Sequence, residues 1–200
     1  NMFENCINLS SISITPEKFL KNSTQYMNKM FSNCQSLTSF DFSNFDTSNV
    51  LDMGSMFASC YIIDLDIQNF DTSSCTNMQF MFFECKAITS LNISNFNTEK
   101  VTNMESMFEF CLNLKSLNVS NFNAEKVENM KRMFYKCQKL TKLDLSSFHA
   151  ISVKHMENMF DECILLTSLD CSNFCFNNLI HPIDMFKSIS NIKILNLKDV

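Results

Sequence analysis

Three histidines and ten cysteines are the residues of this 200-residue chain with the greatest potential for catalysis or metal binding. A cysteine beside a histidine can form a nucleophilic pair, and closely spaced cysteines can bind zinc. Sequence spacing suggests one pair, His155 with Cys163. However, the six other cysteines that recur in the same sequence context have no histidine with them, and no Cys-x-x-Cys motif occurs.

The histidines themselves occupy ordinary polar positions. His149 and His155 stand where equivalent parts of the chain carry Asn, Asp or Thr, so we interpret both as polar surface or turn residues. We therefore expect no enzyme activity, no catalytic residue, no metal ligand and no cofactor.

Another set of polar side chains recurs between two apolar residues, about every 26 residues. Most of its members are followed by a serine two positions later, with Gln68 as the exception. The candidate binding residues are Asp41, Asp66, Asn92, Asn118, Asp144 and Asp170, with the flanking Ser94 and Ser120. Such a flat polar face can offer hydrogen bonds to a partner over a long span. Neighbouring carboxylates can also attract Ca²⁺, and a solvated face that only prevents aggregation is a third interpretation.

The recurring cysteines and the recurring polar residues both belong to a tandem repeat. Eight Met-Phe pairs follow one another at steps of 25 to 28 residues, and a cysteine follows each of the first seven. The pairs begin at Met2, Met30, Met56, Met81, Met107, Met133, Met159 and Met185. A fixed period in the twenties is typical of proteins in which each repeat stacks on the next. One repeat alone buries too little apolar surface to offset its conformational entropy, so we expect it to fold only against its neighbours.

Two kinds of element must position these residues. The pattern Leu-x-x-Leu-x-Val-x-x-Phe contains an apolar–polar alternation, which predicts a short strand with one buried face and, after stacking, a parallel sheet. In the second half of the repeat, an apolar stripe about 120° wide on a helical wheel predicts a short core-facing helix. In one repeat this stripe comprises Val127, Met130, Met133, Phe134 and Cys137. We expect its methionines to fill the core rather than to line a binding groove.

Seven cysteines share one repeat position, on the apolar side of this stripe. Neighbouring helices lie ~8–10 Å apart, which exceeds the ~7 Å between Cα atoms that a disulfide tolerates. We therefore expect a ladder of free, buried thiols, with disulfides or a metal site as the alternatives.

The composition argues against several classes of protein. The chain is 46% hydrophobic and 18% charged, as folded proteins are, and its net charge of −5 offers no basic footprint for nucleic acid. A local basic cluster is interpreted as a solvated helix face. It consists of Lys126, Lys131, Arg132, Lys136, Lys139 and Lys142. No apolar run approaches the roughly 18 residues of a transmembrane helix. We expect residues 1–200 to form a single array that is a slice of a longer repeat protein.

The repeats resemble those of the BspA-like leucine-rich repeat surface proteins. The resemblance rests on the pattern L-x-x-L-x-V-S-N-F followed by V-x-x-M-x-x-M-F-x-x-C, and it covers almost the whole chain. It implies an α/β fold, a horseshoe-like leucine-rich-repeat solenoid with parallel β-strands on one side and short helices on the other, with about 26 residues per repeat. It also implies a bacterial or protist surface protein that adheres to host matrix, other cells or bacteria, without catalytic residues.

Two functions follow as expectations. The first is a non-enzymatic adhesion or protein-interaction scaffold at the cell surface that binds a protein or glycan through its strand face. The alternative is an intracellular, cytoplasmic leucine-rich-repeat scaffold that assembles partner proteins, which a ladder of reduced thiols would favour.

Overall fold

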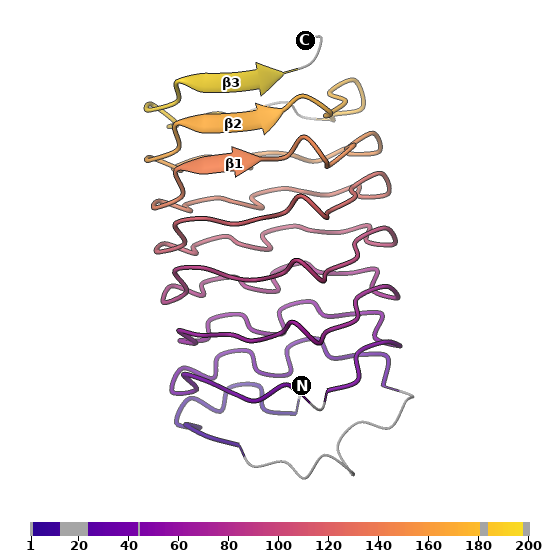
Figure 1. Cartoon of the computed structure of the whole chain (residues 1–200), viewed down its shortest axis with the longest axis vertical. Helices are drawn as coiled ribbons and strands as arrows, with labels where there is room; N and C mark the ends of the chain where they lie inside the picture. Colours follow the sequence, from indigo (N-terminus) through magenta and orange to yellow (C-terminus); the bar gives the residue numbers. More distant parts are fainter. Residues whose placement is uncertain (1, 13–23, 44, 181–183, 198–200) are drawn as a thin grey trace.

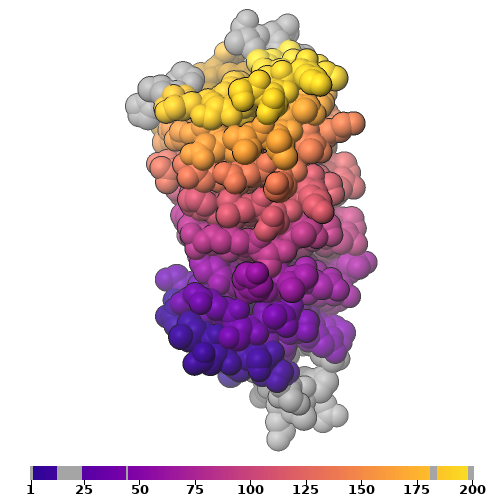
Figure 2. Space-filling model, turned by 90° about the vertical axis from the view of Figure 1, so that its left-hand side faces the viewer, coloured from indigo at the N-terminus to yellow at the C-terminus, as the bar shows by residue number. Residues whose placement is uncertain are grey.

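The chain folds into a column of stacked coils, with one sequence repeat in each coil (Figure 1). The computed structural model describes residues 2–12, 24–43, 45–180 and 184–197. Successive coils occupy successive layers, so the surface changes evenly from N-terminal to C-terminal residues along the column (Figure 2). Residues one repeat apart in the sequence are therefore neighbours in space.

Three short strands lie at the same position of the last three coils. They are β1 (Lys142–Asp144), β2 (Ser168–Cys171) and β3 (Ile194–Leu197), and they form one parallel sheet in the order β1-β2-β3 (Figure 1). The register places Asp144 beside Asp170, and Asp170 beside Asn196. On another side of the column, a row of isolated parallel β-bridges joins successive coils from Tyr26 to His155.

The predicted helices are absent. The described residues contain no helix and only these three strands, so the predicted α/β leucine-rich-repeat solenoid with helices on one side is wrong. The segment with helical spacing forms consecutive β-turns instead. In one coil, the N–H groups of Met107 and Cys111 donate to carbonyls three residues earlier, those of Met104 and Phe108. Between them, the N–H of Phe108 donates to Met133 in the next coil, at 2.9 Å.

The turns and a helix place the same side chains in the core, which is the reason for the error. Apolar residues at the helical offsets are buried in the turns as well, including Val101, Met104 and Met107. The spacing therefore identified the buried face but not the backbone that carries it. An α-helix satisfies its N–H groups within itself. The turns give every second N–H to the neighbouring coil instead, so the coils are bonded to one another along this side.

These turns require a left-handed backbone at two positions in each coil. Ser106 and Phe110, for example, have φ angles of 54° and 61°. Glycine adopts this region most readily, but the whole chain contains one glycine, and that residue does not have a positive φ. This conformation is about 1–2 kcal/mol less favourable for each non-glycine residue. The inter-coil hydrogen bonds and the burial of the core must offset this free energy.

A continuous stack of phenylalanine rings runs through the core. Adjacent rings have centroids 5.5–5.9 Å apart and are tilted by only 4–9° from parallel. The rings belong to Phe31, Phe57, Phe82, Phe108, Phe134, Phe160 and Phe186. Offset aromatic pairs contribute about 0.5–1.5 kcal/mol beyond their burial, so this stack links the coils as the turn hydrogen bonds do.

Polar side chains close the corners between the strand and turn sides. The Asn121 side chain donates to the carbonyls of Ile93 and Phe96 in the preceding coil, at 3.1 and 2.6 Å. The buried Thr98 hydroxyl donates to the Asn123 carbonyl and accepts from the Asn123 N–H. Equivalent bonds recur in neighbouring coils, which explains the Asn of the Ser-Asn-Phe motif and the Thr that follows it.

The predicted ladder of free, buried thiols is confirmed for six of its seven cysteines, and the seventh, Cys6, is half-buried. All ten cysteines are free, and only Cys6 and Cys175 are more than slightly exposed. Six of the seven ladder thiols, from Cys34 to Cys163, donate to a phenylalanine carbonyl of the preceding coil, as Cys137 does to Phe108 at 3.2 Å. Burial raises the pKa of Cys60, Cys111 and Cys163 to about 12. These thiols therefore act as buried hydrogen-bond donors.

Candidate functional site

The candidate polar ladder lies on the strand side of the column. Asp41, Asp66, Asn92, Asn118 and Asp144 are exposed, and so are Ser94 and Ser120, whereas Asp170 in β2 is half-buried. The residues on either side of each ladder position point into the core, as Leu117 and Val119 do beside Asn118. Strands in a sheet lie ~4.7–4.9 Å apart, so the paired Asp144 and Asp170 repeat at about that interval along the column.

Each ladder side chain also makes a local hydrogen bond that the sequence analysis missed. Its Oδ1 accepts from the backbone N–H two residues later, at 2.8–3.2 Å. The acceptors are Asp41, Asp66, Asn92, Asn118, Asp144 and Asp170. This Asx turn bends the chain out of the strand direction. It explains why only Asp and Asn occupy the position, and it leaves each side chain with its other polar atom for further contacts.

The local bonds also keep carboxylates of the ladder charged. Hydrogen bonds from the Ser43 side chain and backbone lower the pKa of Asp41. The Asn196 side chain, which donates to Asp170 Oδ2 at 2.8 Å, lowers the pKa of Asp170 most, followed by the Ser172 hydroxyl. Along the column the face thus presents two neighbouring carboxylates, Asp41 and Asp66, then the amides of Asn92 and Asn118, and then two further carboxylates, Asp144 and Asp170. Within the described ranges, no three His, Cys, Asp or Glu side chains come together in a way that could hold a metal ion.

The Cys163–His155 pair suggested by spacing does not form. The Cys163 thiol donates to the Phe134 carbonyl at 3.0 Å, and the Nδ1 of His155 lies 3.2 Å from Glu157 Oε1. His155 occupies the β-bridge row, at the position that Asn129 has one coil earlier. The His155 side chain is 38% exposed, as expected for the predicted polar surface or turn residue.

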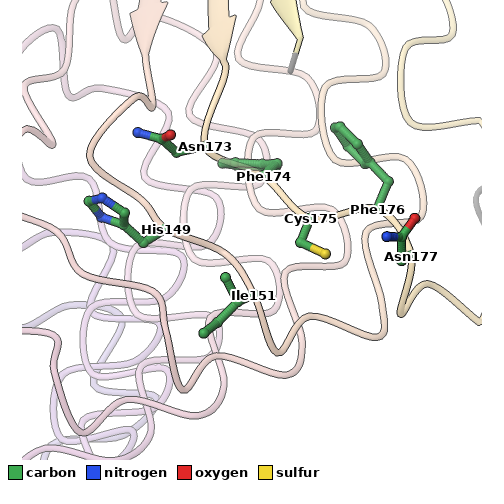
Figure 3. A pocket seen from close by; sticks show the side chains of 7 residues that line it. All are labelled: His149, Ile151, Asn173, Phe174, Cys175, Phe176 and Asn177. Carbon is green, nitrogen blue, oxygen red and sulfur yellow. The ribbon is translucent and has the colours of Figure 1, made fainter. Parts of the chain in front are cut away.

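A hollow of about 340 Å³ lies where the last coils depart from the repeat (Figure 3). It is lined by His149, Ile151, Asn173, Phe174, Cys175, Phe176 and Asn177. The exposed His149 ring has its Nδ1 2.8 Å from the Ser147 carbonyl. Figure 3 shows the Cys175 thiol directed away from this ring. The hollow therefore holds a thiol and an imidazole without bringing them together.

The turn side carries a row of outward-facing aromatic side chains that the sequence analysis did not single out. The rings of Phe83, Phe110 and Tyr135 meet edge to face across three coils, 5.9 and 5.5 Å apart. Lys136 lies over the Phe110 ring at 5.2 Å and pairs with Glu162 at 3.3 Å. Part of the basic cluster is therefore engaged with aromatic rings and a carboxylate. The signal was an aromatic residue at outward positions where other repeats have small, polar or charged residues.

No helix in the described part of the chain is long and apolar enough to cross a membrane. Among known protein families, the model described as "Mycoplasma protein of unknown function, DUF285" matches residues 1–92 and 80–197. The two matched segments overlap and together span nearly the whole sequence. No curated protein matches the chain.

Proposed function

We propose that this chain, which belongs to the DUF285 family of Mycoplasma proteins of unknown function, is a non-enzymatic scaffold that binds a protein or glycan on its strand face. The observation that carries the proposal is the exposed ladder of Asp41, Asp66, Asn92, Asn118 and Asp144. One polar side chain per coil, held by an Asx turn, offers a regular row of hydrogen-bonding groups.

The form of the ladder suits a long ligand. Each coil contributes one polar side chain at a regular interval, and the Asx turn restricts the rotamers of that side chain before a ligand binds. A partner therefore loses less free energy in ordering the site than it would with free side chains. An extended polypeptide or an oligosaccharide with repeating polar groups matches such a row better than a small molecule does. The net charge of −5 also disfavours nucleic acid as a partner.

We propose that the protein is related to the BspA-like leucine-rich repeat surface proteins and that it acts in adhesion at the cell surface. The support for this finer assignment is the repeat pattern, with Leu-x-x-Leu-x-Val-Ser-Asn-Phe followed by the Met-Phe and cysteine positions. Neither a cofactor nor a catalytic residue is part of the proposed function.

A second candidate is an intracellular scaffold that assembles partner proteins. The observation that favours it is the set of ten free cysteines, because reducing compartments keep thiols reduced. Buried thiols that donate to carbonyls are also protected by the core itself, which weakens this inference. We therefore give the surface role precedence.

Binding to an array of extracellular-matrix proteins and glycans tests the strand-face proposal. The double variant Asn118→Arg with Asp144→Arg places two long cations on adjacent coils of the ladder. It should abolish any binding that the wild-type chain shows on the array.

The matched control is Glu99→Arg with Glu125→Arg, which makes a similar charge change at exposed turn positions of adjacent coils. This variant should bind as the wild type does. Equal loss of binding in both variants would indicate a general charge effect, and retained binding in the ladder variant would move the site away from the strand face.

A further inference from the structure

One corner in the interior of the column is shorter than the others. Six of the seven thiol-ladder cysteines are separated by two residues from the next apolar residue of the repeat, as Cys111 is from Leu114. Cys60 is separated from Ile62 by Tyr61 alone. Both Cys60 and Ile62 are nevertheless buried, so this coil keeps its place in the core and lacks a residue only at its corner.

The residue that is missing here connects neighbouring coils elsewhere in the column. At this repeat position, the Ser36 N–H donates to the Ile7 carbonyl at 3.1 Å, and the Asn113 side chain donates to the Lys86 carbonyl at 2.8 Å. One residue spans up to ~3.6 Å of chain. The corner at Tyr61 therefore extends less far outwards than the corners of the coils on either side of it.

A hollow of about 290 Å³ lies at this corner, and we call it the corner notch. It is lined by Gln35, Ser59, Cys60, Tyr61, Glu84 and Lys86. Gln35 and Lys86 occupy the repeat position of Tyr61 in the preceding and the following coil, so they form the two walls. The corner notch thus lies between two stacked coils, with further coils beyond each of them.

The polar groups of the corner notch include both hydrogen-bond donors and acceptors. The Ser59 hydroxyl donates to Glu84 Oε2 at 3.3 Å, and Lys86 Nζ lies 3.5 Å from the same oxygen. The carboxylate and the ammonium offset each other, so the corner notch has no excess of either charge. A carboxylate only accepts hydrogen bonds and an ammonium only donates them, whereas the Gln35 amide does both. A ligand with neutral hydroxyl groups, which also donate and accept, complements all of them.

Tyr61 adds an apolar surface to these polar groups. It is 56% exposed, and its ring can pack against a ligand while its hydroxyl stays hydrated. A pyranose has a face of C–H groups for such a ring and a rim of hydroxyls for polar groups. The volume of the corner notch is near the lower end of the ~300–1,000 Å³ that is usual for ligand sites. It therefore suits one sugar residue rather than a longer segment.

We propose that the corner notch binds one neutral pyranose residue of a glycan. The C–H face of the sugar packs on the Tyr61 ring, and sugar hydroxyls accept from the Lys86 ammonium. Other hydroxyls donate to Glu84 Oε1, which accepts no hydrogen bond from the described residues. The corner notch is separate from the polar ladder, so this binding does not depend on a ligand at the strand face.

Saturation-transfer difference NMR of the 200-residue chain tests the proposal, with the methyl glycosides of glucose, galactose, mannose and N-acetylglucosamine as probes. At least one probe should receive saturation from the wild type. Tyr61→Ala, which removes the aromatic surface, should reduce the transfer to background. Insertion of one alanine between Tyr61 and Ile62, which restores the usual corner length, should do the same. The ladder variant Asn118→Arg with Asp144→Arg should retain the transfer, which distinguishes this site from the strand-face proposal.

The matched control is Ile164→Ala, which removes a 42% exposed apolar side chain at the repeat position of Tyr61, in a coil whose corner has the usual length. It should retain the wild-type transfer, and circular dichroism establishes that each variant is folded. Absence of transfer from the wild type to every glycoside overturns the proposal. So does undiminished transfer in Tyr61→Ala or in the insertion variant, or an equal loss in Ile164→Ala. Transfer to acetate or lysine in place of the glycosides would assign the corner notch to a charged ligand and also overturn the proposal.

Discussion

Replacement of Ser55 by glycine and by alanine distinguishes stacked turns from helices. The glycine variant should be the more stable of the two in turns, and the alanine variant should be the more stable in a helix. Ser55 has a φ of 56°, and its side chain makes no hydrogen bond in the part of the chain that the structure describes. An L-residue costs about 1–2 kcal/mol in this left-handed region, whereas glycine adopts it freely. Glycine also increases the freedom of the unfolded chain, which offsets about 0.4–1 kcal/mol of that gain.

We therefore expect Ser55→Gly to raise the free energy of unfolding by about 0.5–1 kcal/mol. Ser55→Ala should leave it nearly unchanged, because alanine has the same difficulty with a positive φ as serine. In a helix the order would be reversed, with alanine about 1 kcal/mol more stable than glycine. Urea unfolding followed by circular dichroism measures the difference from the transition midpoints, provided that the slopes are equal.

The control is Ser39→Gly, at an exposed position whose φ is not positive. It should lower the free energy of unfolding, since glycine there adds only freedom to the unfolded chain. An alanine variant at position 55 that is clearly more stable than the glycine variant would refute the turn geometry.

Three further predictions follow. Phe108→Ala removes a ring stacked on both faces and should lower the free energy of unfolding by about 3–5 kcal/mol; an effect below 1 kcal/mol in chemical denaturation would contradict the ring stack. Native thiol titration at pH 8 should modify Cys6 and Cys175 and spare the eight buried thiols, and all ten thiols should react in urea. Burial raises the pKa of the Glu109 carboxyl in the folded chain above its pKa in the unfolded chain. The protonated carboxyl therefore favours the folded state at low pH, and this contribution is lost as the pH rises through the pKa of the folded chain. Glu109→Gln should therefore stabilise the chain at pH 7 and not at pH 4, as thermal unfolding at both values would show.

The buried residues of the turn side could be predicted from the sequence, but the conformation of the backbone that carries them could not. The spacing of Val127, Met130 and Met133 predicted that their side chains lie in the core, and all three are buried. Periodicity indicates only which side chains lie on one side of the backbone. Tandem turns and a helix bury side chains at the same sequence positions, so periodicity cannot distinguish them. The distinguishing signal would have been glycine or asparagine at positions such as Ser106. Among the described residues with a positive φ only Asn5, Asn33 and Asn158 provide it, and the other positions hold residues such as Ser, Phe, Glu, Lys and Arg.

The candidate ladder shows a similar limit. Alternation beside buried Leu117 and Val119 correctly placed Asn118 at the surface. Its Asx turn was not predicted, although the serine two residues later is the donor of the bond. A polar residue at a regular surface position can serve the backbone as well as a partner, and the spacing alone cannot separate these roles.

The last rung of the thiol ladder has a consequence for how the column comes apart. The Cys163 thiol donates to the Phe134 carbonyl. The equivalent position in the next coil holds Ile189, whose side chain has no hydrogen-bond donor for the Phe160 carbonyl. A repeat array melts from the coil with the weakest coupling to its neighbour. The coil that contains Ile189 should therefore fray first, and amide exchange should progress from it towards the N-terminus while the central coils remain protected.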